Sequence, residues 1–464
     1  MRSSTFSGGL IIHAPSKIDT VQIDPLPEPK QVTIPIKQHQ GTACTLLIKK
    51  GDAVVQGEII AESASTSIHA TLSGTVLDVK AGFEHISGET VTAVTIGPAE
   101  LAEEKSKKGK KAKKGEKQEE ETAKEQPPRE PNLVRMDELR TIGKILKAGL
   151  IDSSSRFAHP LLDKIRKAQK QGIRALIING LDEFNLQGYQ ASLLADAPDE
   201  VLTGVHALQH ILNPDEVVIT VYENIFQAVT SLPQDEDTFR IVPLKARHPQ
   251  HVDELLVKVV IGQEYPPEMS PEDLGVCIIS LEAAYILGWV LKNNQPFLDT
   301  FISVSGPVLD KPRNIRARIG TSFREILEYL GIAPEAVSKV VHGGPMTGKP
   351  IYDLERPVTK ETGQIYLQGP GETIDYPSKV CVKCGFCVQV CPMRLMPFML
   401  SGFSEAGSFE LAAKYDIFSC IECGCCAFVC PSQIPMVQWI QFGKSALMSE
   451  RSESDEFIQA CRLA

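Results

Sequence analysis

The pattern of hydrophobic and polar positions changes along the chain, and each change marks a predicted unit. Residues 30–97 carry short alternating runs, rich in Val, Ile, Thr and Gly, between turn signals, which is typical of small β-sandwich or barrel domains. From about 133 to 265, buried-strand patterns such as 175–180 alternate with helical patterns such as 160–171. Strands separated by helices predict an α/β unit with a largely parallel sheet.

The same patterns predict further elements of the α/β unit and a smaller mixed unit at 299–350. Helices are expected at 200–212, 221–232 and 322–330, the last capped by Thr321, and strands at 216–221, 239–244, 300–306 and 314–320. The glycine-rich turn at 342–348 could cradle a phosphate, but no helix follows it directly, so we interpret it as a tight connection. Ligands of parallel sheets lie beyond the carboxyl ends of the strands, which here means near 179–183 and 222–224.

Composition changes the picture at residues 101–131, where Lys and Glu replace almost all apolar side chains. Such a segment cannot offset the entropy of ordering, so we expect a flexible charged linker. A lysine-rich block can attract nucleic acid or anionic lipid, but nearby glutamates balance it, and the formal net charge of the chain is −10. Nucleic-acid binding is therefore not expected.

Two cysteine motifs carry the strongest chemical signal. Residues 381–392 and 420–431 both read C-x2-C-x2-C-x3-C-P, the spacing of ferredoxins with two 4Fe–4S clusters. Three cysteines of each motif reach one cluster from a tight loop, and the fourth ligates the partner cluster. The predicted ligand sets are Cys381, Cys384, Cys387 and Cys430 for one cluster, and Cys391, Cys420, Cys423 and Cys426 for the other.

Other uses of these cysteines fit the spacing less well. Tetrahedral zinc sites use well-separated C-x2-C pairs, whereas here a quartet followed by proline occurs twice. Disulfide frameworks are typical of small secreted domains, and this chain begins without an apolar leader. Cys425 lies outside the pattern, and the isolated Cys44, Cys277 and Cys461 are expected to be packing or surface residues.

Cysteine usage and hydropathy also bear on location. Eight thiolate ligands favour a reducing compartment, and no run approaches the roughly 18 apolar residues of a membrane span. We therefore expect the cytoplasm, or the cytoplasmic side of a membrane where another subunit holds the protein. The segment 435–448 is apolar on one face, which could dock on a partner or, as we prefer, pack on its own domain.

The first unit resembles a known carrier domain in part. Residues 49–61 and 68–76 are similar to the two halves of lipoyl and biotinyl domains. The tip between them, 62–67, lacks the lysine that such carriers modify, so a barrel-sandwich without a swinging arm is expected. His69 and His85 are then structural or surface residues and not metal ligands.

Taken in order, these landmarks resemble one family over nearly the whole chain: the RnfC family, which supplies one subunit of the Rnf-type ion-translocating electron transport complex. The resemblance rests on residues 5–9, 38–41, 50–52 with Gly57, 68–70 with 73–74, 275–276, 304–306, 318–321, 343–346 and the double cysteine motif. The ferredoxin signature alone is widespread, and the order of landmarks is what makes the resemblance specific.

The resemblance implies a multidomain α+β protein, in keeping with the three or four domains that 464 residues suggest. The expected domains are a barrel-sandwich hybrid at 1–100, the charged linker at 101–131, an α/β domain like the FMN-binding subunit of respiratory complex I at 132–298, a small β-grasp-like domain at 299–370 and a helical two-cluster ferredoxin-type domain at 371–464.

The flavin motifs of the family are altered in this chain. In the family, a Gly-Gly-Ala-Gly-Phe-Pro loop lets the FMN approach bare backbone, but residues 148–160 carry side chains here, and Asp152 puts an anion where a phosphate would lie. The family's Asn-Ala-Glu-Cys-Glu-Pro-Tyr run corresponds to 179–185, where Glu183 is the main acidic residue retained and the candidate contact of a residual FMN or NADH site. Ser280 replaces a flavin-contacting asparagine. We predict that FMN and NADH do not bind in the usual way.

The resemblance implies an electron-transfer subunit, peripheral on the cytoplasmic face of the cell membrane, that relays electrons through two 4Fe–4S clusters in a complex coupling redox to ion translocation. Other subunits of the complex are the expected partners, with a ferredoxin or a nicotinamide as candidate donor or acceptor. No acid–base or nucleophilic machinery is recognisable, and independent NADH dehydrogenase activity is not expected. One alternative is a soluble iron–sulfur oxidoreductase module, similar to flavoprotein or corrin reductases, that serves a dedicated enzyme. Another is a scaffold whose clusters only stabilise the fold.

Overall fold

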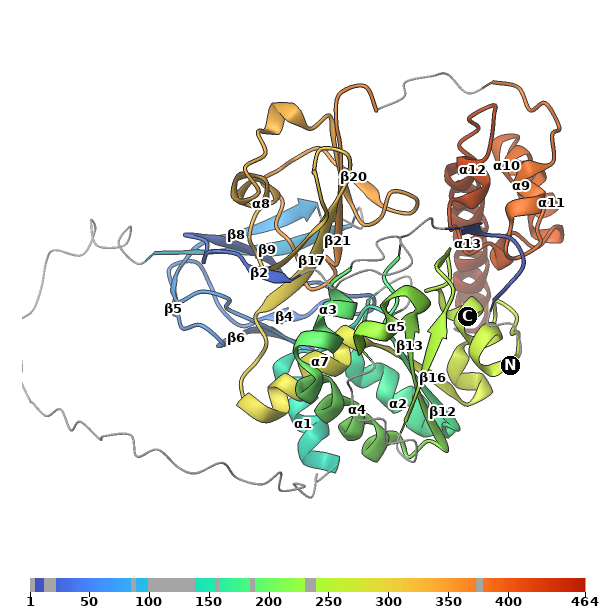
Figure 1. The fold of residues 1–464 in the computed structure, drawn as a ribbon. Coiled ribbons are helices and arrows are strands. Elements are labelled where there is room, and N and C mark those ends of the chain that lie inside the picture. The colour runs from blue at the N-terminus through green and yellow to red at the C-terminus, as the bar shows by residue number, and fades with distance from the viewer. Residues whose placement is uncertain are drawn as a thin grey trace, which may run out of the picture.

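The computed structural model describes residues 5–11, 22–84, 89–98, 138–154, 158–183, 188–229, 239–372 and 379–463, with side chains to residue 449. The predicted linker at 101–131, His85 and the side chain of Cys461 lie outside the described residues. Figure 1 shows the described units side by side, with the ferredoxin-like helices on the right. No helix in the described part of the chain is long and apolar enough to cross a bilayer.

The barrel-sandwich unit consists of two small antiparallel sheets around a shared core. Their strand orders are β3 (Val32–Pro35), β9 (Thr90–Gly97), β8 (Gly74–Glu84), β5 (Ala53–Val54), and β4 (Thr45–Leu46), β6 (Ile59–Glu62), β7 (Ser67–His69). Alternate side chains such as Ile34, Ile60 and Ile96 are fully buried between the sheets. His69 is buried, and its Nε2 lies 2.8 Å from the carbonyl oxygen of Lys147, so it joins this unit to the next.

The α/β unit has a four-stranded parallel sheet between helices (Figure 1). The strand order is β14 (Arg240–Leu244), β13 (Glu216–Tyr222), β12 (Ala175–Asn179), β16 (Val276–Ser280). The helices are α1 (Glu138–Ala148), α2 (Leu161–Gln171), α3 (Tyr189–Asp196), α4 (Pro198–Leu212), α5 (Glu223–Val229), α6 (Asp253–Leu256) and α7 (Leu281–Asn293). The central strands are buried on both faces, which explains why they appear as continuous apolar runs.

The third unit is a six-stranded mixed sheet with one helix, α8 (Phe323–Tyr329). Its strand order is β2 (Ile23–Pro25), β18 (Arg313–Arg318), β17 (Asp299–Ser305), β21 (Gln364–Gln368), β19 (Lys339–His342), β20 (Lys349–Ile351). Strand β2 comes from the first hundred residues and pairs with β18 in parallel, which the expected division at residue 100 does not anticipate. The glycine-rich residues 343–348 connect β19 to β20 as a turn.

The helix cap of this unit differs from the expected one. The structure places Ser322, and not Thr321, at the N-cap of α8, where its hydroxyl accepts from the Glu325 amide at 3.2 Å. The Glu325 carboxylate accepts from the Ser322 amide at 3.0 Å, which completes a capping box. The Thr321 hydroxyl instead donates to the carbonyl of Arg318, because one residue earlier the chain is still in the turn after β18.

The C-terminal unit is made of short helices around the cysteine motifs. They are α9 (Phe386–Val390), α10 (Pro397–Glu405), α11 (Phe409–Lys414), α12 (Cys425–Phe428) and the long α13 (Met436–Leu463). Ile440 and Leu447 of α13 are buried against Leu400 and Ile417, so the apolar face of this helix packs on its own unit. Remaining short elements are β10 (Ile151–Asp152), β11 (His159–Pro160), the π-helical turn Val257–Ile261 and 3-10 turns at Pro271–Leu274, Pro334–Ala336 and Ile417–Ser419.

Two contacts tie the units together. The start of the chain, β1 (Leu10–Ile11), pairs with β15 (Arg247–His248) of the α/β unit, and the Gly9 amide donates to the carbonyl of Val390 in the ferredoxin-like unit. Lys360 of the third unit donates to the carbonyls of Ser67 at 3.1 Å and Gly149 at 2.6 Å. Burial lowers the pKa of this lysine to about 8.

Candidate functional site

The two predicted cysteine quartets line separate cavities. One cavity is lined by Cys381, Cys384, Cys387 and Cys430, and another by Cys391, Cys420, Cys423 and Cys426, with Cys425 beside them. The grouping crosses the two motifs, since Cys430 lies with the first loop and Cys391 with the second. No three His, Cys, Asp or Glu side chains of the described residues are arranged as ligands of a single metal ion. A 4Fe–4S cluster differs from such a site, because each of its thiolates binds a different iron.

The two motifs fold into the same backbone conformation. Lys383 and Glu422, at equivalent positions, both have left-handed backbones, with φ 55° and 54°. The next turn residues, Gly385 and Gly424, have φ 80° and 81° and precede α9 and α12. Glycine adopts this conformation without steric cost. The repeated geometry turns each loop so that its first three cysteines face one cavity.

Backbone amides reach two of the sulfurs of the second quartet. The Leu395 amide donates to Cys391 Sγ and the Glu422 amide to Cys420 Sγ, both at 3.4 Å. Such bonds stabilise negative charge on sulfur and are one of the means by which a protein sets the potential of an iron–sulfur centre. These residues therefore fit a cluster chemically.

The surroundings of the two quartets are different. Cys384 is exposed, whereas Cys423 and Cys426 are buried. Next to the second quartet, the buried Glu422 carboxylate accepts from Lys444 at 2.9 Å and from Gln441 at 2.8 Å. The first quartet therefore faces outward, and the second faces the rest of the protein.

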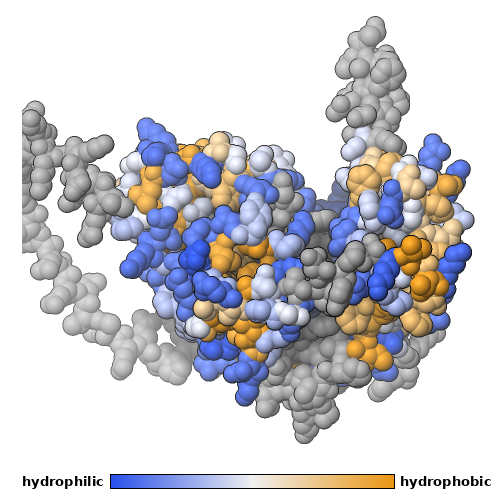
Figure 2. Space-filling model, turned by 90° about the horizontal axis from the view of Figure 1, so that it is seen from above, coloured by the Kyte–Doolittle hydropathy of each residue, from blue (hydrophilic) through white to orange (hydrophobic). Residues whose placement is uncertain are grey.

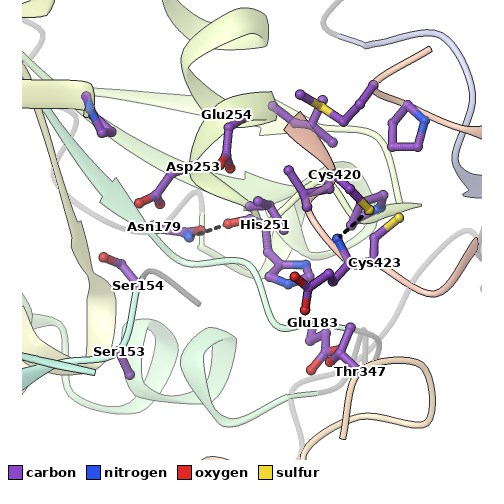
Figure 3. A pocket seen from close by; sticks show the side chains of 18 of the residues that line it. Ser153, Ser154, Asn179, Glu183, His251, Asp253, Glu254, Thr347, Cys420 and Cys423 are labelled. Atoms are coloured by element: carbon purple, nitrogen blue, oxygen red, sulfur yellow. Dashed lines mark hydrogen bonds between the residues drawn. The ribbon is translucent and has the colours of Figure 1, made fainter. Parts of the chain in front are cut away.

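A histidine and a glutamate join the second cysteine loop to the other units. The fully buried His248 places Nε2 2.7 Å from the carbonyl oxygen of Cys423 and Nδ1 3.4 Å from that of Glu183. The Glu183 carboxylate accepts from the Gly344 amide at 3.3 Å and from the Thr347 hydroxyl. Glu183, the candidate flavin contact, thus holds the turn 343–348 against the α/β unit (Figure 3).

A cavity of about 1300 Å³ lies where three units meet. Its lining includes Asn179 and Asp253 from the α/β unit, Thr347 from the third unit, and Cys420 and Cys423 from the second cysteine loop (Figure 3). The cavity therefore runs from the carboxyl ends of the parallel strands, where ligands are expected, to the second quartet.

At the strand ends, a carboxylate of the protein itself takes the available donors. Asp152 is fully buried and accepts from the Ser280 amide at 2.7 Å, the Ser154 hydroxyl at 2.5 Å and Lys164 Nζ at 2.8 Å. Burial alone would raise the pKa of Asp152, but Lys164 and the hydrogen bonds hold it below its ordinary value. Burial would lower the pKa of Lys164, but Asp152 keeps it raised.

This arrangement fits a flavin phosphate poorly. The backbone donor at Ser280 and the cation of Lys164 are already neutralised by Asp152, and the Ser280 hydroxyl caps α7 by accepting from the Ala283 amide. Burial also raises the pKa of Glu282, which lines the same cavity, to about 7. Lys164 was not anticipated from the sequence, although a lysine in the first turns of the helix after Asp152 was a usable signal.

Comparison with known proteins identifies each unit. Family models match the RnfC barrel sandwich hybrid domain at residues 4–100, the Nuo51 FMN-binding domain at 147–288 and the 4Fe-4S dicluster domain at 380–434. The chain is 30% identical to the RnfC protein of the ion-translocating oxidoreductase complex of Rhodobacter capsulatus, over 94% of this chain and 81% of that protein. The chain belongs to the RnfC family.

Other RnfC relatives are similarly close. The chain is 30% identical to the Yersinia pestis bv. Antiqua protein, over 98% of this chain and 71% of that one, and 29% identical to the Pseudomonas aeruginosa protein, over 97% and 56%. Among solved structures, an NAD+-reducing [NiFe]-hydrogenase chain matches with a TM-score of 0.44 and 17% identity, over 60% of this chain and 54% of that one, too weakly to support an inference.

Membership of the RnfC family confirms several predictions. The chain is an electron-transfer subunit of an ion-translocating complex, with an iron–sulfur dicluster domain, and other subunits of that complex are its partners. The barrel-sandwich, the flavin-type α/β domain and the ferredoxin-like domain are confirmed. The β-grasp assignment, the domain boundaries and the individual cluster ligands stay predictions.

Proposed function

We propose that this subunit passes single electrons through two 4Fe–4S clusters, one held by Cys381, Cys384, Cys387 and Cys430, the other by Cys391, Cys420, Cys423 and Cys426. The observation that supports this most directly is that each quartet lines its own cavity, in the crossed arrangement that the spacing predicts. When bound, the clusters supply one-electron redox chemistry. A scaffold with redox-silent clusters is the competing hypothesis.

The protein's own residues would tune these centres. Amides of Leu395 and Glu422 stabilise charge on two sulfurs, and the Glu422–Lys444 pair keeps the neighbourhood of the second quartet close to neutral. His248 fixes the backbone of the second loop through the Cys423 carbonyl. Burial of this loop excludes water from most of its sulfurs.

We further infer that the α/β unit does not hold FMN in the usual way, although its family model is an FMN-binding domain. Asp152 occupies the donors that a phosphate would need, and Glu183 is engaged by Gly344 and Thr347. NADH, a second phosphate-bearing ligand, meets the same obstacle. Glu183 stays a candidate contact only for a ligand that displaces the turn at 343–348.

The partners of this subunit are proposed to hold it at the cytoplasmic face of the membrane, with a ferredoxin or a nicotinamide as the ultimate donor or acceptor. The names of its relatives, which place them in an ion-translocating oxidoreductase complex, support this location. They do not favour the alternative of a soluble module serving a dedicated enzyme.

One set of measurements on the purified protein tests both proposals. We expect about eight irons and eight acid-labile sulfides per chain, two reducible centres in an EPR redox titration, and no flavin. Stoichiometric FMN, or bleaching of the cluster absorbance by NADH, would contradict the flavin proposal. Clusters that stay oxidised across the physiological range would favour the scaffold hypothesis.

A further inference from the structure

The first cysteine loop is surrounded by exposed apolar side chains. Val380, Val382 and Phe386 are 89%, 67% and 50% exposed, and Phe428 is 67% exposed. Phe386 begins α9 and Phe428 ends α12, and these two helices pack against each other. Figure 2 shows hydrophobic side chains gathered on the lobe at the right, which the ferredoxin-like unit forms. With Lys379 and Lys383, these four residues form what we call the Cys384 face.

The charges of the Cys384 face are of one sign. Lys379 and Lys383 are both exposed, and neither forms an ion pair with any described residue. The two segments that build the cysteine loops, 379–403 and 423–447, contain no Asp or Glu at all. The whole chain, by contrast, has a formal net charge of −10. The face is therefore a basic and apolar area on an acidic protein.

The same position on the second loop has the opposite character. Glu422, the counterpart of Lys383, is buried and bonded to Lys444 and Gln441, and Gly424 lies against the carbonyl of Met346. The other units thus cover the second quartet, while Cys384 of the first quartet is exposed. A protein that exchanges electrons with the first quartet can approach it only from the Cys384 face.

We propose that the Cys384 face is the docking surface for a one-electron carrier protein whose own redox centre lies beneath an acidic, apolar-centred surface. This inference rests on the cluster ligands proposed above. Basic residues at the rim steer an acidic partner, and the apolar residues exclude water at the contact. A small interface suffices, because electron-transfer complexes are transient.

The transfer itself needs no bond rearrangement. The reduced carrier loses one electron and is oxidised, and the centre held by the Cys381 quartet gains that electron and is reduced. No proton or group moves, and the reverse direction balances in the same way. The exposed Cys384 makes the distance between the two centres short.

The test uses the full-length protein with its clusters and two probes of opposite charge: an acidic plant-type [2Fe–2S] ferredoxin and basic cytochrome c. The variant is Lys379→Glu with Lys383→Glu. Glutamate suits the left-handed backbone at 383, because Glu422 has that conformation at the equivalent position. The control is Lys49→Glu with Lys80→Glu, two exposed lysines of the barrel-sandwich unit that give the same change in net charge.

At low ionic strength we expect the double reversal on the Cys384 face to weaken binding of the acidic ferredoxin about tenfold or more, and to slow electron exchange with it in parallel. The control should leave both unchanged, and salt should weaken binding to the wild-type protein. Phe428→Ser should weaken binding at all salt concentrations.

Two results would overturn the assignment of this face: unchanged affinity for the acidic ferredoxin after the double reversal, or tighter binding of cytochrome c to the wild-type protein. Self-association in sedimentation experiments that Phe428→Ser abolishes would assign the face to a second copy instead. Iron content and EPR titration separate these from failure of the proposed function, because a protein without reducible clusters fails at that step whatever its affinities.

Discussion

At the scale of residues, the pair of Asp152 and Lys164 decides what the α/β unit can bind. Sequence comparison with the family noted the anion, but the partner lies twelve residues further on and its contact depends on how α2 packs. With side-chain exposures of 0% and 9%, the pair is buried and each charge depends on the other. A phosphate would have to displace a carboxylate that the fold already neutralises.

Lys164→Met is expected to destabilise the protein by about 3–5 kcal/mol, because it leaves the Asp152 charge buried without its partner. Asp152→Asn combined with Lys164→Met should recover much of that loss, since no unpaired charge remains. Midpoints of chemical unfolding, with the variants compared in one buffer, measure both effects. Equal destabilisation by the single and the double variant would show that the pair is not coupled.

Glu282→Gln is expected to change how stability depends on pH. Burial raises the pKa of Glu282 to about 7 in the folded chain, so its stabilising contribution is fully present below the ordinary value of 4.5 and is lost as the pH rises through 7. At about 1.4 kcal/mol per pKa unit, the change amounts to at most about 3 kcal/mol.

The measurement is the midpoint of thermal unfolding between pH 4.5 and 8. The wild-type midpoint should fall relative to that of Glu282→Gln across this range, and the exposed Glu335→Gln serves as the control. Parallel curves for wild type and Glu282→Gln would mean that Glu282 ionises normally in the folded protein.

At the scale of elements, the sequence predicted what local pattern and spacing determine. Strands β12 and β13 and helices α2 and α4 lie within a few residues of the predicted positions, because apolar runs and helical periodicity directly reflect burial. Strand β16 and helix α7 were not predicted, although 276–279 is apolar throughout and gave a usable signal. Strand β2 could not be found, because its three residues gain their partner only from the tertiary fold.

The candidate site divides in the same way. Cysteine spacing predicted both quartets, because ligand geometry is local to each loop. The contacts of His248 and Glu183 join residues far apart in the sequence, and no motif records them. The spatial relation between the cysteine loops and the α/β unit therefore came only from the structure.

His248→Phe is expected to loosen the second cysteine loop while keeping the ring volume. It removes the donor to the Cys423 carbonyl, and an unpaired buried carbonyl costs about 1–3 kcal/mol. Hydrogen exchange of amides in 421–425 should become faster by the corresponding factor, with the exposed His210→Phe as control. Unchanged exchange in that segment would contradict a positioning role for His248.

At the scale of the whole molecule, the units surround one cysteine loop and leave the other open. The α/β unit contacts the second loop through His248, and the third unit contacts it through Met346. The start of the chain binds the carbonyl of Val390 between them. An electron path through this protein therefore has an inner end beside the large cavity and an outer end at Cys384.

The crossed arrangement of the quartets gives the sharpest whole-molecule prediction. Cys430 follows the second motif in sequence but lines the cavity of the first loop, so Cys430→Ala should alter the same EPR signal as Cys384→Ala. Cys391→Ala should instead alter the signal that Cys423→Ala alters. In each variant iron content should fall below about eight per chain, while the other centre keeps its potential within a few tens of millivolts. Cys425→Ala, which removes a buried sulfur outside the spacing pattern, should keep its full iron content. If Cys430→Ala and Cys423→Ala altered one and the same signal, each motif would hold its own cluster and the crossed assignment would be wrong.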